Sequence, residues 1–409
     1  MAVAAAGVVQ AQASPAMPAP GDTTPVTLVT MGQGDAVWER FGHNALIVPA
    51  PWGTPLAYNW GMFDFKQPNF LGRFLLGDTR YWMEPFPVAP MLDAYRADNR
   101  TLVAQQLALT PAQRSALVAA LAVNAEEANK YYRYDYYRDN CSTRPRDALD
   151  AVLGGVLRPQ LARMPGTGSY RWHTRRILHD NLPLYFGAQL VLGVDADAPL
   201  TAWEEAFLPQ SFAASLRRVE LPAADGLPVR MLVAREDTIF RAERPPERME
   251  APTRLPIAMF VGTLLAAALL IVGRGPRGAA LAVGGWSTLA VLLGGVLLFA
   301  WFLTRHAYMR NNPSVALVHP AWVIGIVAAV ACWRGTVSRA CWRGTVSRGV
   351  RSAMRWLLVV AVVGSAGAAL AGHAGSALEM AALFLPAHAA AAFLVDREGK
   401  RRLERGAVA

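Results

Sequence analysis

One cysteine stands apart from the other thiols of the 409-residue chain. Cys141 lies in the N-terminal half, whereas Cys332 and Cys341 belong to a nine-residue segment, 331–339, that recurs unchanged at 340–348. A thiolate is a strong nucleophile, and an odd cysteine in an exported region indicates either a reactive thiol or a buried, inert one. The residues around Cys141 therefore decide how it is interpreted.

These residues predict a helix that begins directly after Cys141. Residues typical of helix starts come first and apolar residues with helical spacing follow: Ser142, Thr143, Pro145, then Leu149, Val152 and Leu153. Arg138, Arg144 and Arg146 flank the cysteine. Free amides, the helix dipole and nearby cations all favour thiolate over thiol, so this pattern indicates a reactive cysteine.

A thiol nucleophile needs a base, and His43 is the best placed histidine. It follows Gly42 at the start of an apolar strand, 43–48, and a second strand-like segment, 55–61, could pair with that strand as a hairpin. Asn59 or Asn44 could then orient the imidazole. His173 and His179 are interpreted instead as part of a basic helix face. The three histidines lack zinc-ligand spacing, so we expect neither a metal nor another cofactor.

Composition divides the chain into an exported part and a membrane part. We expect a signal-like or disordered leader at 1–20, a catalytic domain at 21–243, a linker at 244–254, membrane helices at 255–396 and a basic cytoplasmic tail at 397–409. Much of the formal charge of +10 lies between apolar runs, which indicates membrane topology and no nucleic-acid partner.

Five apolar runs predict about five membrane-spanning helices. They lie at 255–273, 280–304, 314–333, 356–373 and 375–395. The final pair, separated near His373, could instead form a re-entrant hairpin. Arginine- and lysine-rich segments follow the first, third and fifth runs, so these segments should be cytoplasmic. The prediction is a multi-pass protein of the bacterial inner membrane, with its catalytic domain in the periplasm and its C-terminus in the cytoplasm.

Four motifs together resemble one known family. Phe41-Gly42-His43-Asn44, Tyr58 to Phe65, Phe70 to Tyr81 and Tyr134 to Thr143, within roughly residues 25–215, resemble the DUF4105 family, also described as the N-terminal periplasmic domain of Lnb, the lipoprotein N-acyltransferase. The resemblance implies an α+β domain of permuted papain-like (NlpC/P60-type) fold, followed by the helical membrane bundle.

The same resemblance implies roles for individual residues. Cys141 would be the nucleophile, His43 the base and Asn59 the third catalytic residue. Substrate or oxyanion contacts are expected from four further residues: Asn44, Asn140, Ser142 and Tyr58. Amides at the start of the Cys141 helix, including that of Cys141, could stabilise the oxyanion.

The implied reaction moves an acyl chain from a membrane phospholipid, through a cysteine thioester, to the N-terminal amine of a lipoprotein. Two alternatives keep the same residues: a papain-like hydrolase of peptidoglycan or lipid, and a non-catalytic periplasmic sensor or assembly module.

Overall fold

The computed structural model describes residues 25–48, 54–223, 228–334 and 345–407. The expected leader and most of the duplicated segment lie outside these residues. The chain forms two compact units. The first runs to His173 and includes Ala198–Met249, and the second combines Thr174–Asp197 with the chain from Glu250 onward. The second unit thus contains a helical segment that composition alone assigns to the exported domain.

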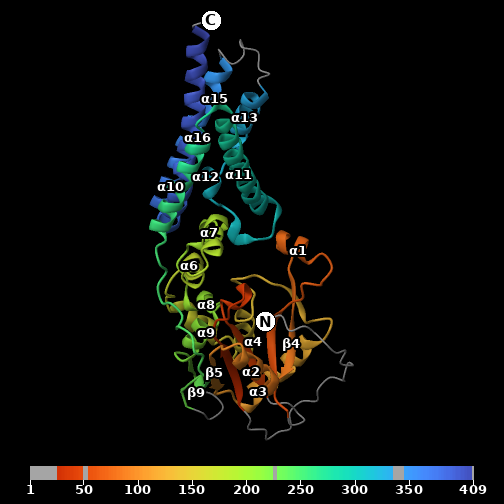
Figure 1. Cartoon of the computed structure of the whole chain (residues 1–409). Coiled ribbons are helices and arrows are strands. Elements are labelled where there is room, and N and C mark those ends of the chain that lie inside the picture. Colours follow the sequence, from red (N-terminus) through yellow and green to blue (C-terminus); the bar gives the residue numbers. More distant parts are fainter. Residues whose placement is uncertain (1–24, 49–53, 224–227, 335–344, 408–409) are drawn as a thin grey trace. The chain divides into compact units, whose positions relative to one another are not determined.

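The first unit is built on a seven-stranded sheet in which all neighbouring strands are antiparallel (Figure 1). The strand order is β6-β4-β3-β2-β1-β5-β9. The strands are β1 (Val26–Met31), β2 (His43–Val48), β3 (Leu56–Met62), β4 (Arg80–Pro87), β5 (Leu102–Leu107), β6 (Tyr131–Arg133) and β9 (Val233–Phe240), while β7 (Glu220–Leu221) and β8 (Arg230–Met231) pair separately. The predicted hairpin is confirmed, because β2 pairs with β3.

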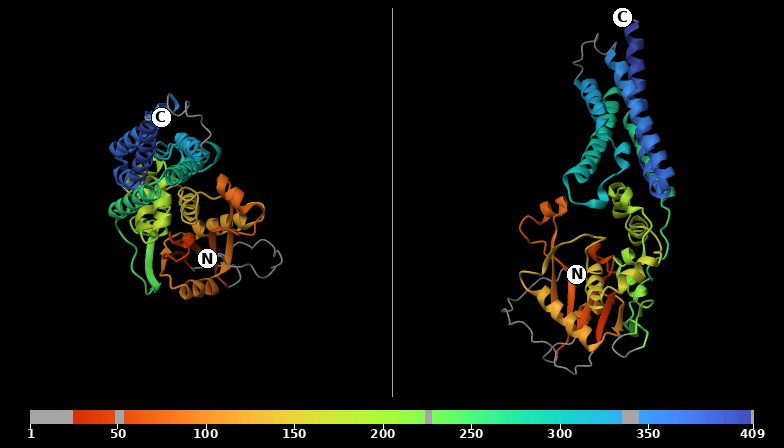
Figure 2. Two further views of the ribbon diagram at one scale, coloured as in Figure 1. Left: turned by 45° about the horizontal axis from the view of Figure 1, so that its top comes forward. Right: turned by 180° about the vertical axis from the view of Figure 1, so that it is seen from behind.

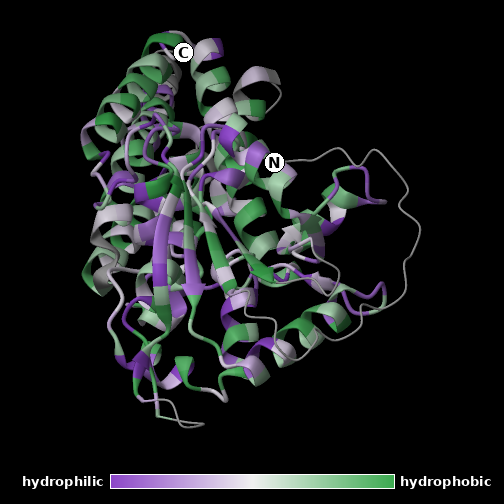
Figure 3. Cartoon of the chain, turned by 90° about the horizontal axis from the view of Figure 1, so that it is seen from below, coloured by the Kyte–Doolittle hydropathy of each residue, from purple (hydrophilic) through white to green (hydrophobic). Residues whose placement is uncertain are grey.

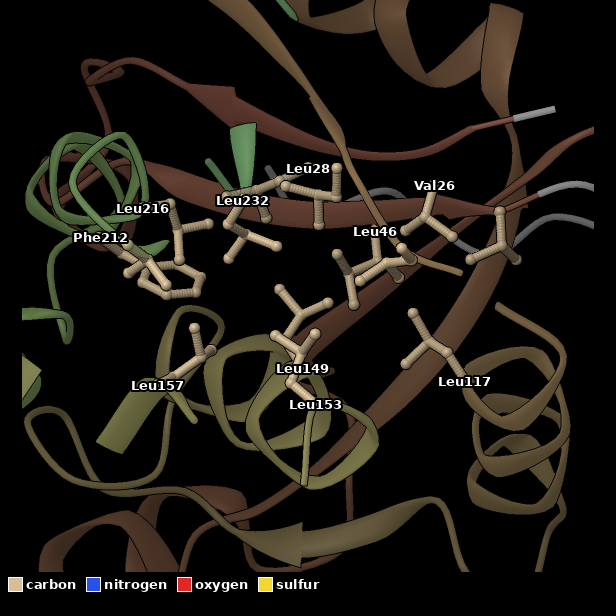
Figure 4. Close-up of a cluster of buried hydrophobic side chains, with 14 of the residues drawn as sticks. Val26, Leu28, Leu46, Leu117, Leu149, Leu153, Leu157, Phe212, Leu216 and Leu232 are labelled. Carbon is tan, nitrogen blue, oxygen red and sulfur yellow. The ribbon is translucent and has the colours of Figure 1, made fainter. Parts of the chain in front are cut away.

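Side chains that alternate along the strands give this sheet two apolar faces. On one face, Leu28 and Leu46 belong to a buried cluster with Leu149 of helix α4 (Thr143–Val152), as Figure 4 shows. On the other face, Ala45 packs in a cluster with Met91 of helix α2 (Val88–Ala97). Full burial of one leucine contributes roughly 1.5–3 kcal/mol, so the first cluster holds α4 firmly against β1 and β2.

Short helices complete the first unit. They are α1 (Phe70–Leu76), α3 (Pro111–Ala125), α5 (Leu157–Arg163), α8 (Ala202–Glu205) and α9 (Pro209–Leu216), with the 3-10 turn η1 (Val37–Glu39) and the first half of α6 (Tyr170–Ile177), a helix that is shared between the two units. Helix α3 begins at a capping box, in which Thr110 accepts a hydrogen bond from the Gln113 amide and Gln113 bonds back. The N-terminal region is therefore α+β, as predicted.

Within the described residues of the second unit, four helices are long and apolar enough to cross a membrane, whereas about five were expected. The candidate spans are Leu255–Val272, Pro276–Leu303, Arg348–Ala371 and Gly375–Lys400. They lie in α10 (Leu255–Val272), α11 (Pro276–Leu303), α15 (Thr345–Ala368) with η5 (Ala369–His373), and α16 (Ala374–Ala407). Figure 2 shows these helices packed side by side, and the hydropathy colouring of the ribbon in Figure 3 marks many residues of the helical region as hydrophobic.

The third apolar run is interrupted, which explains the difference in number. It forms α12 (Ser314–Leu317), η4 (Pro320–Trp322) and α13 (Val323–Arg334). Pro320 cannot donate a backbone hydrogen bond, and it disfavours helical geometry at His319 before it. The Leu317 carbonyl instead bonds Nε2 of His388 at 2.9 Å, and Nδ1 of His388 accepts from Trp286 at 2.9 Å. His388 thus satisfies the polar groups that the break exposes.

The last two apolar runs form an antiparallel pair of long helices. Arg355 of α15 pairs with Asp396 of α16 at 2.8 Å, far from the π-helical connection η5. Helix α16 continues without a break to Ala407, so the segment expected as a tail from 397 extends the helix. Both helices reach membrane-spanning length, whereas a re-entrant hairpin would need shorter segments.

A buried carboxylate ties the segment Thr174–Asp197 to the helices of its own unit. Glu379 of α16 is fully buried and accepts hydrogen bonds from Arg175 at 2.8 Å and from the Tyr185 hydroxyl at 2.9 Å. It also accepts from the Arg254 amide at 2.7 Å. Tyr185 lies in α7 (Leu182–Val191), which precedes the turn η2 (Val194–Ala196). This network neutralises a charge that would otherwise be costly to bury.

Candidate functional site

Cys141 is buried immediately before α4, as the sequence predicts for a residue at a helix start. The Asn140 side chain holds this start in place. Its Oδ1 accepts hydrogen bonds from the amides of Ser142 at 2.8 Å and Thr143 at 2.9 Å, and its Nδ2 donates to the Phe207 carbonyl at 3.0 Å. Asn140 therefore occupies two of the free amides that a helix start would offer to a substrate.

Ser142 and the Asn44 side chain join the start of α4 to the sheet. The Ser142 hydroxyl donates to the Ala206 carbonyl at 2.6 Å and accepts from Nδ2 of Asn44 at 3.0 Å. Oδ1 of Asn44 accepts from the Thr30 hydroxyl at 2.8 Å. All three side chains are buried. Ser142 and the side chains of Asn44 and Asn140 thus support the site and point their polar groups at other protein groups.

The Cys141 sulfur lies where the β2–β3 ladder ends. The last bonded pair at this end is Ala45 with Asn59, and the register between β3 and β4 shifts between Trp60 and Met62. Burial raises the pKa of the Cys141 thiol, and a hydrogen bond from the backbone amide of Asn44 lowers it by less. Gly61 has a φ of +85°, and a Cβ at this position would lie 3.5 Å from the Cys141 Cβ. Both strands therefore contribute backbone to the walls around the thiol.

His43, next to Asn44 on β2, is hydrogen-bonded to the third predicted residue. Its Nε2 lies 3.0 Å from Oδ1 of Asn59. Nδ2 of Asn59 donates to the Ala57 carbonyl at 2.9 Å, which assigns Oδ1 as the acceptor for the imidazole. Nε2 then carries the proton, and Nδ1 has the lone pair that a base requires. The rings of His43 and Tyr95 also stack, with 6.2 Å between centroids.

Burial sets the resting charges of the two groups. It raises the pKa of the Cys141 thiol to about 11, and it lowers the pKa of His43 to about 4. This differs from the thiolate expected from the flanking arginines. Arg144 pairs with Asp139 and Arg146 with Asp147, so both cations are already engaged. A neutral thiol and a neutral imidazole can act as nucleophile and base only if the thiol proton moves to the imidazole as the sulfur attacks.

Arg100 is a site residue that sequence reasoning missed. Its side chain is 1 % exposed, its Nε donates to the Gly32 carbonyl at 2.9 Å, and its guanidinium lies over the Tyr95 ring. Its charge lowers the pKa of both Cys141 and His43, although burial has the larger effect on each. Arginine is rarely buried and no motif marks this one, so only the fold places this cation near the thiol.

Three residues that the sequence analysis considered, Tyr58, His173 and His179, lie outside the group of residues around Cys141. Tyr58 faces the α4 side of the sheet within the apolar cluster, opposite to the neighbouring Asn59. His173 lies on the arginine-rich helix α6, where it is buried with Nε2 2.7 Å from the Glu205 carboxylate. His179 bonds the Arg176 carbonyl within its own turn.

A cavity of about 460 Å³ lies beside α3 and α4. It is lined by polar residues, including Asn124, Asp139 and Arg144, together with Trp60, whereas Cys141 and His43 do not line it. Within the described ranges, no group of three or more His, Cys, Asp or Glu residues converges as a metal site would require.

Comparison with known families identifies the region that carries this site. Residues 19–180 match the model of the Lnb N-terminal periplasmic domain. This segment is similar to that family. The match includes His43, Asn59 and Cys141, and it ends before residue 215, to which the sequence resemblance was expected to extend. No curated protein and no solved structure matches the chain. A periplasmic domain family followed by four candidate spans indicates a multi-pass membrane protein.

Proposed function

We propose that this chain is a membrane-bound acyltransferase of the Lnb type. Cys141 takes an acyl chain from a phospholipid and passes it to the N-terminal amine of a lipoprotein. The observation that carries the proposal is the meeting of β2, β3 and the start of α4, where the Asn44 amide bonds the Cys141 sulfur and the neighbouring His43 bonds Asn59. A nucleophilic helix packed on an antiparallel sheet that carries the base also supports a permuted papain-like site.

In the first half-reaction, His43 Nδ1 accepts the thiol proton while the Cys141 sulfur attacks the ester carbonyl carbon of the lipid. The carbonyl oxygen becomes an oxyanion. The backbone amides of Asn44 and Cys141 both act on the sulfur in the resting state, and they are the donors best placed to stabilise this oxyanion. The carbon–oxygen ester bond then breaks. The lysophospholipid oxygen takes the proton from His43, and Cys141 carries a thioester.

In the second half-reaction, the amine of the acceptor attacks the thioester carbonyl. His43 takes a proton from the amine, the carbon–sulfur bond breaks, and the sulfur recovers its proton from His43 as the amide forms. Because Asn59 accepts from Nε2–H, it keeps Nδ1 available in both half-reactions. Asn59 would therefore be a positioning residue.

The same proposal includes the topology. We infer that the first unit lies in the periplasm of a bacterial inner membrane and that the C-terminus is cytoplasmic, as the arginine-rich connections indicate. This arrangement requires an odd number of crossings, so the interrupted segment Ser314–Arg334 would supply a fifth crossing beside the four long helices. A C-terminal fluorescent protein that folds only in the cytoplasm should fluoresce, and a C-terminal alkaline phosphatase should stay inactive.

The decisive experiment measures N-terminal acylation of a reporter lipoprotein by mass spectrometry. The host is depleted of its own N-acyltransferase and makes the wild type, Cys141→Ala, or the matched thiol control Cys332→Ala. We expect an added acyl chain with the wild type and the control, and none with Cys141→Ala.

Other outcomes would replace the proposal. An unmodified reporter in every strain, combined with cleavage of purified muropeptides, would favour a peptidoglycan hydrolase. Full function of Cys141→Ala in cells would favour the non-catalytic sensor or assembly module. Release of free fatty acid without any acylated amine would favour a lipid hydrolase.

A further inference from the structure

Large apolar side chains gather on the exposed surface of one small part of the first unit. Six residues of the η1 turn, the β3–α1 connection and α1 are more than a third exposed: Val37, Trp38, Phe65, Leu71, Leu75 and Leu76. We call this group the α1 surface. Folding normally hides leucine and phenylalanine, and contiguous exposed groups of this kind mark sites that bind proteins, ligands or membranes.

Aromatic rings that begin at the α1 surface form a continuous row that leads toward Cys141. Trp38 contacts Phe65 with 5.5 Å between ring centroids, and Phe65 contacts Phe63 at 5.0 Å. The row continues from Phe63 to Tyr81 at 5.1 Å and from Tyr81 to Tyr134 at 4.4 Å.

Its inner end reaches the site at Gly61. A Cβ on Gly61 would lie 3.4 Å from the Tyr134 ring and 3.5 Å from the Cys141 Cβ. Only a glycine therefore separates the last ring of the row from the nucleophile. Aromatic rings therefore connect the surroundings of the thiol to the α1 surface along this path.

The chemistry of the α1 surface fits lipid better than a protein partner. Tryptophan and phenylalanine favour the boundary between head groups and acyl chains, and leucine favours the hydrocarbon. The exposed Lys66, between Phe65 and α1, suits an anionic head group.

The chain also keeps this unit near lipid. The first unit ends at Met249 and the first candidate span begins at Leu255, so the five intervening residues can extend by no more than about 20 Å. A short tether of this kind raises the effective concentration of bilayer lipid for every surface of the unit.

We propose that the α1 surface binds the acyl chains of membrane phospholipid and that the ring row guides a chain toward Cys141. The lipid contact needs only the exposed side chains, whereas the role of the ring row rests on the proposed acyl transfer. The surface would act by presenting the ester of a bound lipid to the thiol, with the chain tail held among Phe63, Phe65 and the leucines of α1.

The first test is photocrosslinking of the full-length protein in nanodiscs of phosphatidylethanolamine and phosphatidylglycerol that contain an alkyne-tagged phosphatidylethanolamine. A benzoylphenylalanine replaces Leu75 or, as a matched control, Val123 of α3, since both native side chains are 53 % exposed. We expect lipid labelling at position 75 to exceed that at 123 by about tenfold, because leucine contacts with hydrocarbon are worth that much in binding.

Labelling should be the same in the Cys141→Ala background, because lipid contact precedes chemistry. Equal lipid labelling at both positions would overturn the proposal. A crosslink from position 75 to a second copy of the chain or to another protein, in place of lipid, would also overturn it.

The second test separates this inference from the proposed function. Leu71→Gln/Leu75→Gln should raise the KM for phospholipid about tenfold and leave kcat nearly unchanged, whereas Val123→Gln should change neither. If the wild type transfers acyl chains and the double variant has the same KM, the α1 surface is not the lipid site although the function stands. If no variant transfers acyl chains but position 75 still labels lipid, the proposed function fails and the lipid surface stands.

Discussion

Asn59→Ala tests whether the hydrogen bond between Asn59 and His43 positions the base. The substitution removes the Oδ1 acceptor 3.0 Å from Nε2 and leaves the cavity of a side chain that is 2 % exposed. The imidazole is then able to rotate or to move its proton to Nδ1, and in either state it cannot accept a proton from Cys141. The other hydrogen bond that Asn59→Ala removes is the one from Nδ2 to the Ala57 carbonyl, and Ala57 has no role in the proposed mechanism.

The size of the effect follows from the two roles of this bond. A neutral hydrogen bond contributes about 0.5–1.5 kcal/mol, and the unsatisfied Nε2–H costs about 1–3 kcal/mol. Unfolding free energy should therefore fall by about 2 kcal/mol. If most of the free energy of this hydrogen bond also favours the tautomer of His43 with its proton on Nε2, kcat should fall about 10- to 100-fold. The KM for phospholipid should stay constant.

The assay is steady-state acyl transfer with purified full-length protein in nanodiscs, combined with thermal unfolding. Asn124→Ala is the matched control, because Asn124 accepts a hydrogen bond from Trp60 in the same unit but lies outside the Cys141 site. Asn59→Asp keeps an acceptor and should recover much of the rate, with an acid limb moved to higher pH because the carboxylate stabilises the imidazolium. A rate for Asn59→Ala within twofold of the wild type, at unchanged KM, would refute the reasoning.

Three further predictions concern pH, the glycine beside the thiol and the buried carboxylate of the second unit. The transfer rate should be constant between about pH 5 and pH 10 and should fall below about pH 4. The reason is that burial lowers the pKa of His43 to about 4 and protonation removes the base. A fall in rate that begins near pH 6.5 would contradict this prediction. The same lowered pKa means that unfolded chains bind a proton more readily, so stability should also decline as pH falls from about 6.5 toward 4. Gly61→Ala should lose about 1–2 kcal/mol of stability from its φ of +85° and also lose transfer activity, since the new methyl group contacts Cys141. Gly155→Ala, at a φ of +79° with no atom near its Cβ position, should lose similar stability and keep its activity; equal activities of the two variants would show that the space beside the thiol is unimportant. Glu379→Gln should lower the thermal unfolding temperature of the detergent-solubilised protein, because half-buried Arg175 loses its charged partner. In a Tyr185→Phe background the same substitution should lower the unfolding temperature by less; additive effects would argue against one shared network.

Local sequence predicted the elements of the site well. The strand residues around His43 and the helix-start residues after Cys141 have patterns whose physical causes, side-chain alternation and helix capping, act over a few residues. The hairpin of β2 and β3 and the helix beginning after Cys141 follow from those causes. The length of the apolar runs likewise predicted membrane helices. It could not reveal that Pro320 interrupts the third run, because the length of a run does not show that proline lacks a backbone N–H donor.

The tertiary structure alone decided which groups surround the thiol and how it is charged. Nearby arginines in the sequence suggested a thiolate, yet Arg144 and Arg146 pair with their own acidic neighbours, and the distant Arg100 is the cation whose charge acts on the sulfur. Asn140 and Ser142, adjacent to the nucleophile, satisfy backbone groups, because chain neighbours at a helix start must first complete that helix. The residue types and their order are thus determined locally by the sequence. Burial raises the pKa of Cys141 only when β2, β3 and α4 pack together, because desolvation depends on atoms supplied by the whole fold. The same packing brings Asn44 and Gly61 close to the thiol.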